Sequence, residues 1–284
     1  MLTCIGDLTV DVITWPKGQI TRETEQKAGI LFCPGGQAAN CARFAAEQKV
    51  ETTFFARSGN DFLGNWIIKK LEDKGVNCRV KQKGKTAVTT ALVSEGERTF
   101  LNDPGANTQL CMEDIDFEEI KNSEHVHVGG YWALDSLRND LPELFSYARK
   151  NNVQSSLSIG WDPNGWEKRE ELLELLELVD VFFLNEKEAL ALTEEKNLEK
   201  ALEKMGSLPV VHMGSKGCLV NGTQVPAKKV EEKNPVGSGD AFNAAFIKHF
   251  MEGRTPEKSA EEAVKFASKQ INKTIPKGEN NGTK

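Results

Sequence analysis

Short apolar segments alternate with amphipathic segments along most of this chain. Residues 124–130, 153–160 and 180–185 have the length and composition of buried strands, and each precedes a stretch with helical spacing. Parallel strands need a crossover connection, and alternating helices supply it while covering both faces of the sheet. The alternation therefore predicts an α/β fold, a three-layer sandwich around a central, mostly parallel sheet. Further helices are predicted at 35–48, 61–75, 140–152, 170–179, 186–193, 240–252 and 256–272.

Two segments break the alternation, because they contain strand-like runs with no helix between them. They are residues 8–33 and 84–103, and the second is a hairpin pattern around Glu95 and Gly96. We expect these segments to form one small, mainly antiparallel sheet that lies over one side of the main body as a lid. The 284 residues are predicted to form a single domain with this lid.

Composition excludes several classes of function. The net charge of −6 argues against a nucleic-acid surface, which needs clustered Lys and Arg. The six cysteines form neither a CxxC motif nor a pattern with zinc-ligand spacing, so we expect reduced thiols and no structural metal. The first 15 residues lack the pattern of a signal peptide, and no apolar run reaches membrane length. These features favour a cytoplasmic protein with no membrane partner.

Glycine and polar residues gather where predicted strands end. In sheets of this kind, ligands bind at the carboxyl ends of the strands, in the loops that lead to helices. Five segments occupy such positions: "CPGGQAAN" at 33–40, "VGGY" at 128–131, "FLNEKEA" at 183–189, "HMGSKG" at 212–217 and "NPVGSGD" at 234–240.

The last of these segments indicates a specific chemistry. Gly237, Ser238 and Gly239 precede a predicted helix, and the N–H groups of a helix N-terminus form an anion site. Asp240 beside such a site would repel an anionic ligand. A carboxylate is useful there if it accepts the proton of an attacking hydroxyl. Asp240 is therefore a candidate general base, and the three small residues are a candidate transition-state clamp.

Each element also has a simpler interpretation on its own. "GSGD" could be an ordinary helix cap, "GGQAAN" a tight turn with close helix packing, and "GSKG" a β-turn. Asn185 and Glu188 could be polar residues of a first helical turn, and Asp7 and Asp11 could be solvated acids at a strand end. Their order along one predicted sheet favours a common site.

That order resembles the ribokinase-like, PfkB-type carbohydrate kinase family. "GGQAANCA" at 35–42 resembles the N-terminal signature of the family, and "GSGDAF" at 237–242 resembles the core of its C-terminal signature. "GERTFLNDPGAN", "NEKEA" and "GSKG" resemble family landmarks in the expected sequence between them. The similarity extends from Gly6 to about Ala267, and five motifs in order are more specific than any one of them.

The resemblance implies an ATP- and Mg²⁺-dependent kinase that phosphorylates a hydroxyl of a sugar or sugar-like acceptor. Asp240 would be the catalytic base, and an anion hole would hold the γ-phosphoryl group. Glu188 would organise Mg²⁺ through water. It also implies a lid-to-lid homodimer. The implied anion hole is Gly237, Ser238 and Gly239; the implied acceptor site is Thr9, Asp11, Gly35, Gly36 and Asn40; the implied nucleotide site is Asn185, Gly214, Ser215, Lys216 and Gly217.

Two features depart from the family pattern. Asn234 and Pro235 stand where the family signature has an acid and a hydroxyl residue. The acid helps to hold a monovalent cation in potassium-activated relatives, so its loss argues against cation activation. The segment Asp162–Asn164 has the family's Asp-Pro-Asn pattern without a closely following Arg. The sequence leaves open whether this loop reaches the acceptor.

Three rival functions fit parts of the sequence. A nucleoside kinase of the same fold would need an apolar lid lining, which Trp15, Phe32 and Phe100 could supply. A non-catalytic sugar or nucleotide sensor would have no use for the base at Asp240. A dinucleotide-dependent redox enzyme is disfavoured because no GxGxxG motif follows the first strand. The identity of the acceptor is left open, since it depends on a few contacts.

Overall fold

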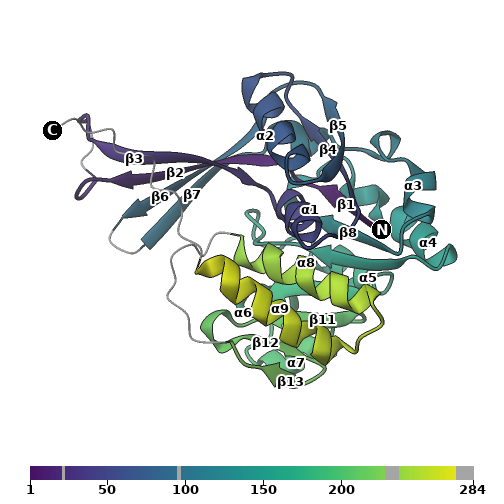
Figure 1. Ribbon diagram of the computed structural model, residues 1–284. Coiled ribbons are helices and arrows are strands. Elements are labelled where there is room, and N and C mark those ends of the chain that lie inside the picture. The colour runs from purple at the N-terminus through teal and green to yellow at the C-terminus, as the bar shows by residue number, and fades with distance from the viewer. Residues whose placement is uncertain (21–22, 95–96, 228–236, 273–284) are drawn as a thin grey trace.

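The computed structural model describes residues 1–20, 23–94, 97–227 and 237–272. Within these residues, nine strands form one large sheet in the order β13-β12-β11-β10-β9-β8-β1-β4-β5, and four strands form a separate sheet (Figure 1). All neighbours in the large sheet are parallel except β11–β12 and β12–β13. This is the predicted ribokinase-like α/β architecture.

The elements have the following bounds. The large sheet contains β1 (Leu2–Gly6), β4 (Thr52–Ser58), β5 (Val76–Gln82), β8 (His125–Gly129), β9 (Gln154–Ser158), β10 (Val181–Asn185), β11 (Leu208–His212), β12 (Cys218–Val220) and β13 (Thr223–Val225). The helices are α1 (Gln37–Glu47), α2 (Phe62–Glu72), α3 (Phe117–Lys121), α4 (Leu141–Lys150), α5 (Arg169–Leu176), α6 (Glu186–Thr193), α7 (Leu198–Glu203), α8 (Ser238–Met251) and α9 (Pro256–Ile271).

Two apolar cores lie on the two faces of the large sheet. Strand side chains alternate between them, so that Val181 and Phe183 of β10 join one core while Phe182 and Leu184 join the other. Helices α1, α2, α8 and α9 cover the first core, and α3 to α6 cover the second. Figure 1 shows α8 and α9 packed side by side, with α1 next to α8. This packing brings the N-terminus of α8 against α1.

The smaller sheet projects from one side of the body (Figure 1). It contains β2 (Thr9–Pro16), β3 (Ala28–Gly35), β6 (Ala87–Ser94) and β7 (Glu97–Asp103) in the order β3-β2-β6-β7. The pairs β2–β3 and β6–β7 are antiparallel and β2–β6 is parallel. The predicted hairpin therefore exists as β6 and β7, whereas its expected turn at Glu95 and Gly96 lies outside the described residues.

The structure adds elements that the sequence pattern did not indicate. Strand β5 alternates Val76, Cys78 and Val80 with polar residues and forms an edge of the large sheet. Helices α3 and α7 are only five and six residues long, too short for a clear period. No helix in the described ranges combines the length and apolar character that a membrane crossing requires.

Candidate active site

The turn from β1 into β2 and the start of β2 place two carboxylates, Asp7 and Asp11, beside the glycines that precede α1. Asp7 is buried, and its Oδ1 accepts a hydrogen bond of 2.9 Å from the N–H of Ala38. It is therefore not the solvated acid of the simpler interpretation. A Cβ atom on Gly35 would lie 2.3 Å from the Asp11 carboxylate, and one on Gly36 would lie 2.4 Å from the Asp7 carbonyl oxygen. Both glycines are required because these acids leave no space for a side chain.

Burial perturbs both carboxyls. Burial, and to a smaller extent the negative charge of Asp7, together raise the pKa of Asp11 to about 7. Burial also raises the pKa of Asp7, against hydrogen bonds from the backbone that lower it. Buried acids with raised pKa values are candidates for functional residues.

Thr9 forms a hydrogen bond with Asn107, which lies in the segment that follows the small sheet. Asn107 Nδ2 donates to Thr9 Oγ1 at 3.4 Å, and Asn107 Oδ1 accepts from the Leu8 N–H at 3.0 Å. Asn107 ends the "GAN" landmark and belongs to the short helix η1 (Gly105–Gln109). Thr9 is itself buried, and its hydroxyl oxygen accepts this hydrogen bond.

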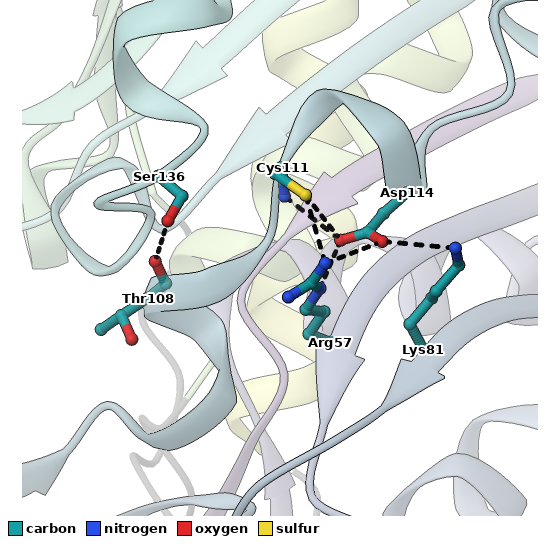
Figure 2. A network of polar contacts seen from close by, with 6 residues as sticks. All are labelled: Arg57, Lys81, Thr108, Cys111, Asp114 and Ser136. Carbon is teal, nitrogen blue, oxygen red and sulfur yellow. Dashed lines mark hydrogen bonds and ion pairs between the residues drawn. The ribbon is translucent and has the colours of Figure 1, made fainter.

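A polar network anchors the chain just beyond η1. Figure 2 shows Arg57, Lys81 and Cys111 directed at the carboxylate of Asp114. Arg57 binds it in a bidentate manner, through Nε and through Nη2 at 3.1 Å. The Ser136 hydroxyl donates to the Thr108 carbonyl oxygen at 2.8 Å. The contacts of Asp114 tie the chain just after Asn107 to the ends of β4 and β5, and the Ser136 bond ties Thr108 to the segment between β8 and α4.

The N-terminus of α8 has the form of an open anion cradle. Gly237 occupies the cap position with φ of 74°, a left-handed conformation that glycine adopts without strain, and no side chain of the described residues caps the helix. Asp240 stands three positions later, where a capping acid would bond back to the backbone. Instead its Oδ2 accepts from Asn40 Nδ2 at 3.0 Å. The arrangement therefore differs from the ordinary helix cap that the motif alone allowed.

Asp240 has the electrostatics of a base. Burial raises its pKa to about 8, with the charges of Asp7 and Asp11 in the same direction. The hydrogen bond from Asn40 and the charge of Arg43 oppose the rise. A carboxyl that gains and loses its proton near neutral pH is matched to general base catalysis.

Asn185 and Glu188 form a reciprocal cap at the start of α6. Asn185 Oδ1 accepts from the Glu188 N–H at 3.0 Å, and Glu188 Oε2 accepts from the Asn185 N–H at 2.9 Å. The first-turn role weighed from the sequence is thus real. It occupies one oxygen of the buried Glu188, whose pKa burial raises and these hydrogen bonds lower. Among the described residues, no three His, Cys, Asp or Glu side chains group as a metal site.

The segment Gly214–Gly217 lies at the same edge of the sheet. It follows β11, whose His212 pairs with Asn185 of β10, and Gly214–Lys216 form a short helix, η5. Lys216 Nζ lies 3.9 Å from a carboxylate oxygen of Glu186 at the start of α6. The predicted nucleotide residues therefore share one side of the site.

The N-terminus of α8 connects the two sides. Asp240 contacts Asn40 of α1, while a Cβ on Gly239 would lie 3.3 Å from Nδ1 of His212 at the end of β11. Burial lowers the pKa of His212 to about 4, so the ring is neutral at physiological pH. A group held between Gly239 and Asp240 would face the loops that follow β10 and β11 on one side and the β1–β2 turn on the other.

The register of the small sheet decides which side chains face the site. Trp15 and Phe100 share a face with Asp11, because Ile13 pairs with Ala91 and Ala91 with Phe100. Phe32 pairs with Val12 on the opposite face. Of the three aromatic residues that could supply an apolar lid lining, Phe32 therefore lies on the opposite face from Trp15 and Phe100.

The loop at Asp162–Asn164 is internally bonded. Asp162 is buried, and its two oxygens accept from the N–H groups of Asn164 and Trp166 at 2.8 and 2.7 Å. The Asp162 carboxylate thus stabilises the backbone conformation of this loop. The positions of Asn234 and Pro235 lie outside the described residues.

Four residues of the site were absent from the predicted set. Asp7 was interpreted only as a solvated acid, Asn107 and His212 stood in quoted segments without an assigned role, and Arg43 carries no motif signal. Only the packing of α1 and β11 against α8 reveals the last two.

Comparisons with known proteins agree with this geometry. The model of the pfkB family carbohydrate kinases matches residues 1–277. An ATP-dependent ribose-1-phosphate kinase from Halopiger xanaduensis is 28% identical, over 90% of this chain and 84% of the relative. The adenosine kinase of Sinorhizobium meliloti has a TM-score of 0.85 at 23% identity, over 96% of this chain and 94% of that one. A candidate ribokinase II from E. coli, solved with ATP and Mg²⁺, has a TM-score of 0.81 at 22% identity, over 97% and 94% of the two chains.

The fold and the ordered motifs define a ribokinase-like kinase, a phosphotransferase with an alcohol group as acceptor. The chain belongs to the pfkB family of carbohydrate kinases.

Proposed function

We propose that this protein transfers the γ-phosphoryl group of ATP to a hydroxyl of a sugar or sugar-like acceptor. The observation that carries the proposal is the position of the α8 N-terminus. Through Asp240 it touches the acceptor side at Asn40, and through Gly239 it approaches the nucleotide side at His212. Phosphoryl transfer needs a base and an anion cradle between two bound substrates, and this helix end supplies both.

In the reaction, the acceptor oxygen forms a bond to the γ-phosphorus as the bond from that phosphorus to the ADP oxygen breaks. Asp240 accepts the proton of the acceptor hydroxyl. The N–H groups of residues Gly237–Gly239 stabilise the charge on the transferring oxygens. Because Oδ2 of Asp240 is held by Asn40, the other oxygen is the one that faces the acceptor.

The acceptor lies between the start of α1 and the small sheet. Asp11 binds its hydroxyls, and Gly35, Gly36, Asn40 and Thr9 line the site. Asp11 and Asp240 suit polyols, because carboxyl oxygens accept hydrogen bonds from hydroxyl groups. The similarity to a ribose-1-phosphate kinase supports a pentose acceptor.

A nucleoside is the second candidate acceptor. Trp15 and Phe100 stand on the site face of the small sheet, and Phe100 is 59% exposed. The exposed Phe100 ring and the partly buried Trp15 ring would stack on a base.

The nucleotide lies over the ends of β10 and β11, with Asn185 and residues Gly214–Gly217 at its border. Glu188 has one oxygen committed to the Asn185 N–H, and its carboxylate would organise Mg²⁺ through water. A single acid fits this ion, which keeps several waters and takes its other ligands from substrate phosphates. When bound, Mg²⁺ neutralises charge on the transferring phosphate.

The small sheet serves as the lid of the acceptor site and as a dimer contact. Four large apolar side chains on it are 50–60% exposed, namely Ile30, Phe32, Phe100 and Leu101. A projecting sheet with bare apolar residues and open edges is a liability in water. Pairing with the lid of a second copy of the chain relieves it, in a two-fold dimer.

The test is ADP release from ATP and Mg²⁺ with D-ribose, ribose 1-phosphate, D-fructose or adenosine, with Asp240→Asn as the matched control. Acceptor-dependent ADP release that the variant lacks is the expected result. Acceptor and ATP binding without ADP release at any pH would indicate a sensor and refute the kinase proposal.

A further inference from the structure

Arg43 lies one turn after Asn40 on α1 and points toward the site. Its Nη2 donates to Asn40 Oδ1 at 3.2 Å, and its Nη1 donates to Glu47 Oε1 at 3.3 Å. The guanidinium carbon lies 3.9 Å from the centre of the Phe44 ring. Its Nε is buried with no hydrogen-bond partner among the described residues. The side chain is therefore held on three sides with its charge close to Asp240.

These contacts determine the orientation of the Asn40 amide. A guanidinium can only donate, so the amide atom that faces Arg43 is the oxygen. The amide nitrogen must then face Asp240, where an ionised carboxylate can only accept. Asn40 is buried, which leaves its amide little freedom to turn. A continuous chain of polar contacts thus runs from Glu47 through Arg43 and Asn40 to Asp240.

We propose that Arg43 is a positioning residue for phosphoryl transfer, which orients the Asn40 amide and through it anchors one oxygen of Asp240 so that the other faces the acceptor hydroxyl. This inference rests on the proposed role of Asp240 as the base. A guanidinium bonded to the amide oxygen polarises the amide and strengthens the bond from Nδ2 to the carboxylate. Arg43 therefore also favours the ionised form of the base.

The charges around Asp240 show why this support is needed. Asp7 and Asp11, from the β1–β2 side, both raise its pKa in addition to burial, and Arg43 from α1 lowers it. His212 of β11 is neutral, because burial lowers its pKa to about 4. Cys33 of β3 stays a thiol, since burial and then Asp11 raise its pKa to about 11. Arg43 thus supplies the positive charge that opposes the two acids.

The test compares Arg43→Met and Arg43→Lys with the wild type across pH 6 to 10. The assay is ADP release with the acceptor that is fastest among D-ribose, ribose 1-phosphate, D-fructose and adenosine. In Arg43→Met we expect the midpoint of the acidic limb of the kcat/KM profile to move up by about one pH unit, because the positive charge that favours ionised Asp240 is lost. One unit corresponds to about 1.4 kcal/mol of differential stabilisation of the two protonation states of Asp240. Activity would fall about tenfold below the midpoint and recover near pH 10. Arg43→Lys keeps the charge and would shift the limb less.

Glu47→Gln is the matched control, because it removes the ion pair of Arg43 and leaves the contact with Asn40. Its profile should keep the wild-type midpoint. An acceptor-free measurement uses Asp240→Asn in a double-mutant cycle with Arg43→Met. The loss of thermal stability from Arg43→Met at pH 9 should be smaller when Asp240 is already Asn.

A uniform loss at every pH with an unchanged midpoint would show a merely structural role and overturn the inference, as would additive effects in the cycle. If Arg43→Met does not fold, the midpoint of Arg43→Lys decides. Failure of the proposed function looks different: Asp240→Asn would keep near-normal turnover. An inactive Asp240→Asn together with superimposable Arg43 profiles would refute only the role of Arg43.

Discussion

The replacement of Asp240 by Asn is predicted to lower activity and raise stability at the same time. As the base, Asp240 must take a proton from the acceptor, and an amide cannot do so. We expect turnover to fall by a factor of about 10² or more, while ATP binding is nearly unchanged. Asn has the same shape and can still accept the hydrogen bond from Asn40.

The stability effect follows from the raised pKa. The carboxyl has an ordinary pKa of 3.8 in the unfolded chain and about 8 in the fold. Above pH 3.8 the unfolded chain releases this proton and the folded one retains it, so the stability that Asp240 contributes falls as the pH rises toward 8. The shift of about four units sets an upper bound of about 5–6 kcal/mol, at about 1.4 kcal/mol per unit.

The measurable effect is smaller, because the buried amide that replaces the carboxyl has a desolvation cost of its own. We expect Asp240→Asn to be more stable by about 1–3 kcal/mol at pH 8.5, and a gain of this kind raises the melting temperature by roughly 2–4 °C per kcal/mol.

Thermal melts at pH 6, 7, 8 and 9 test this, with Asp73→Asn as control. Asp73 is exposed at the end of α2, in a surface ion pair with Lys69, and its replacement should show no growing stabilisation with pH. The reasoning is refuted if the advantage of Asp240→Asn is the same at every pH, or if the variant keeps near-normal turnover.

Three further outcomes are expected. Activity should require Mg²⁺ and show weak or no stimulation by K⁺, because Asn234 replaces an acid of the family signature; assays in Na⁺, K⁺ and a bulky organic cation decide this, and a several-fold K⁺ effect would contradict it. Phe32→Ser should weaken the dimer in light scattering across concentrations, whereas Phe62→Ser, 79% exposed on α2, should not; a monomeric wild type would exclude the dimer. Gly35→Ala should raise KM for the acceptor at least tenfold without changing ATP binding, because the added Cβ would lie 2.3 Å from the Asp11 carboxylate. The control Gly29→Ala on the same strand should be tolerated, because its Cβ would have its nearest contact at 3.6 Å, and equal KM values for the two variants would count against the acceptor site.

The large sheet follows from local sequence pattern. Segments such as residues 181–184 are apolar throughout, as strands buried on both faces must be, and amphipathic helices come between them. The order of the glycine motifs also placed Gly237 and Asp240 at a helix N-terminus, because caps and turns are determined by neighbouring residues. Strand β5 and helices α3 and α7 were missed, since an edge strand with mixed polarity and a helix of five or six residues give weak periodicity.

The chemistry of the site depends on contacts between residues far apart in the chain. Asn40 and Asp240 are 200 positions apart, and nothing local to either indicates their hydrogen bond. The raised pKa of Asp240 needs burial together with the charges of Asp7 and Asp11, which only the packing of α1, β1 and α8 brings together. Likewise, Phe32 and Phe100 look equivalent in the sequence, but the strand register places them on opposite faces of one sheet. The sequence by itself determined the elements and the order of the motifs, because those depend on short-range periodicity and turn chemistry. The tertiary structure decided which charges and side chains face one another, because burial and electrostatic coupling depend on distance in space.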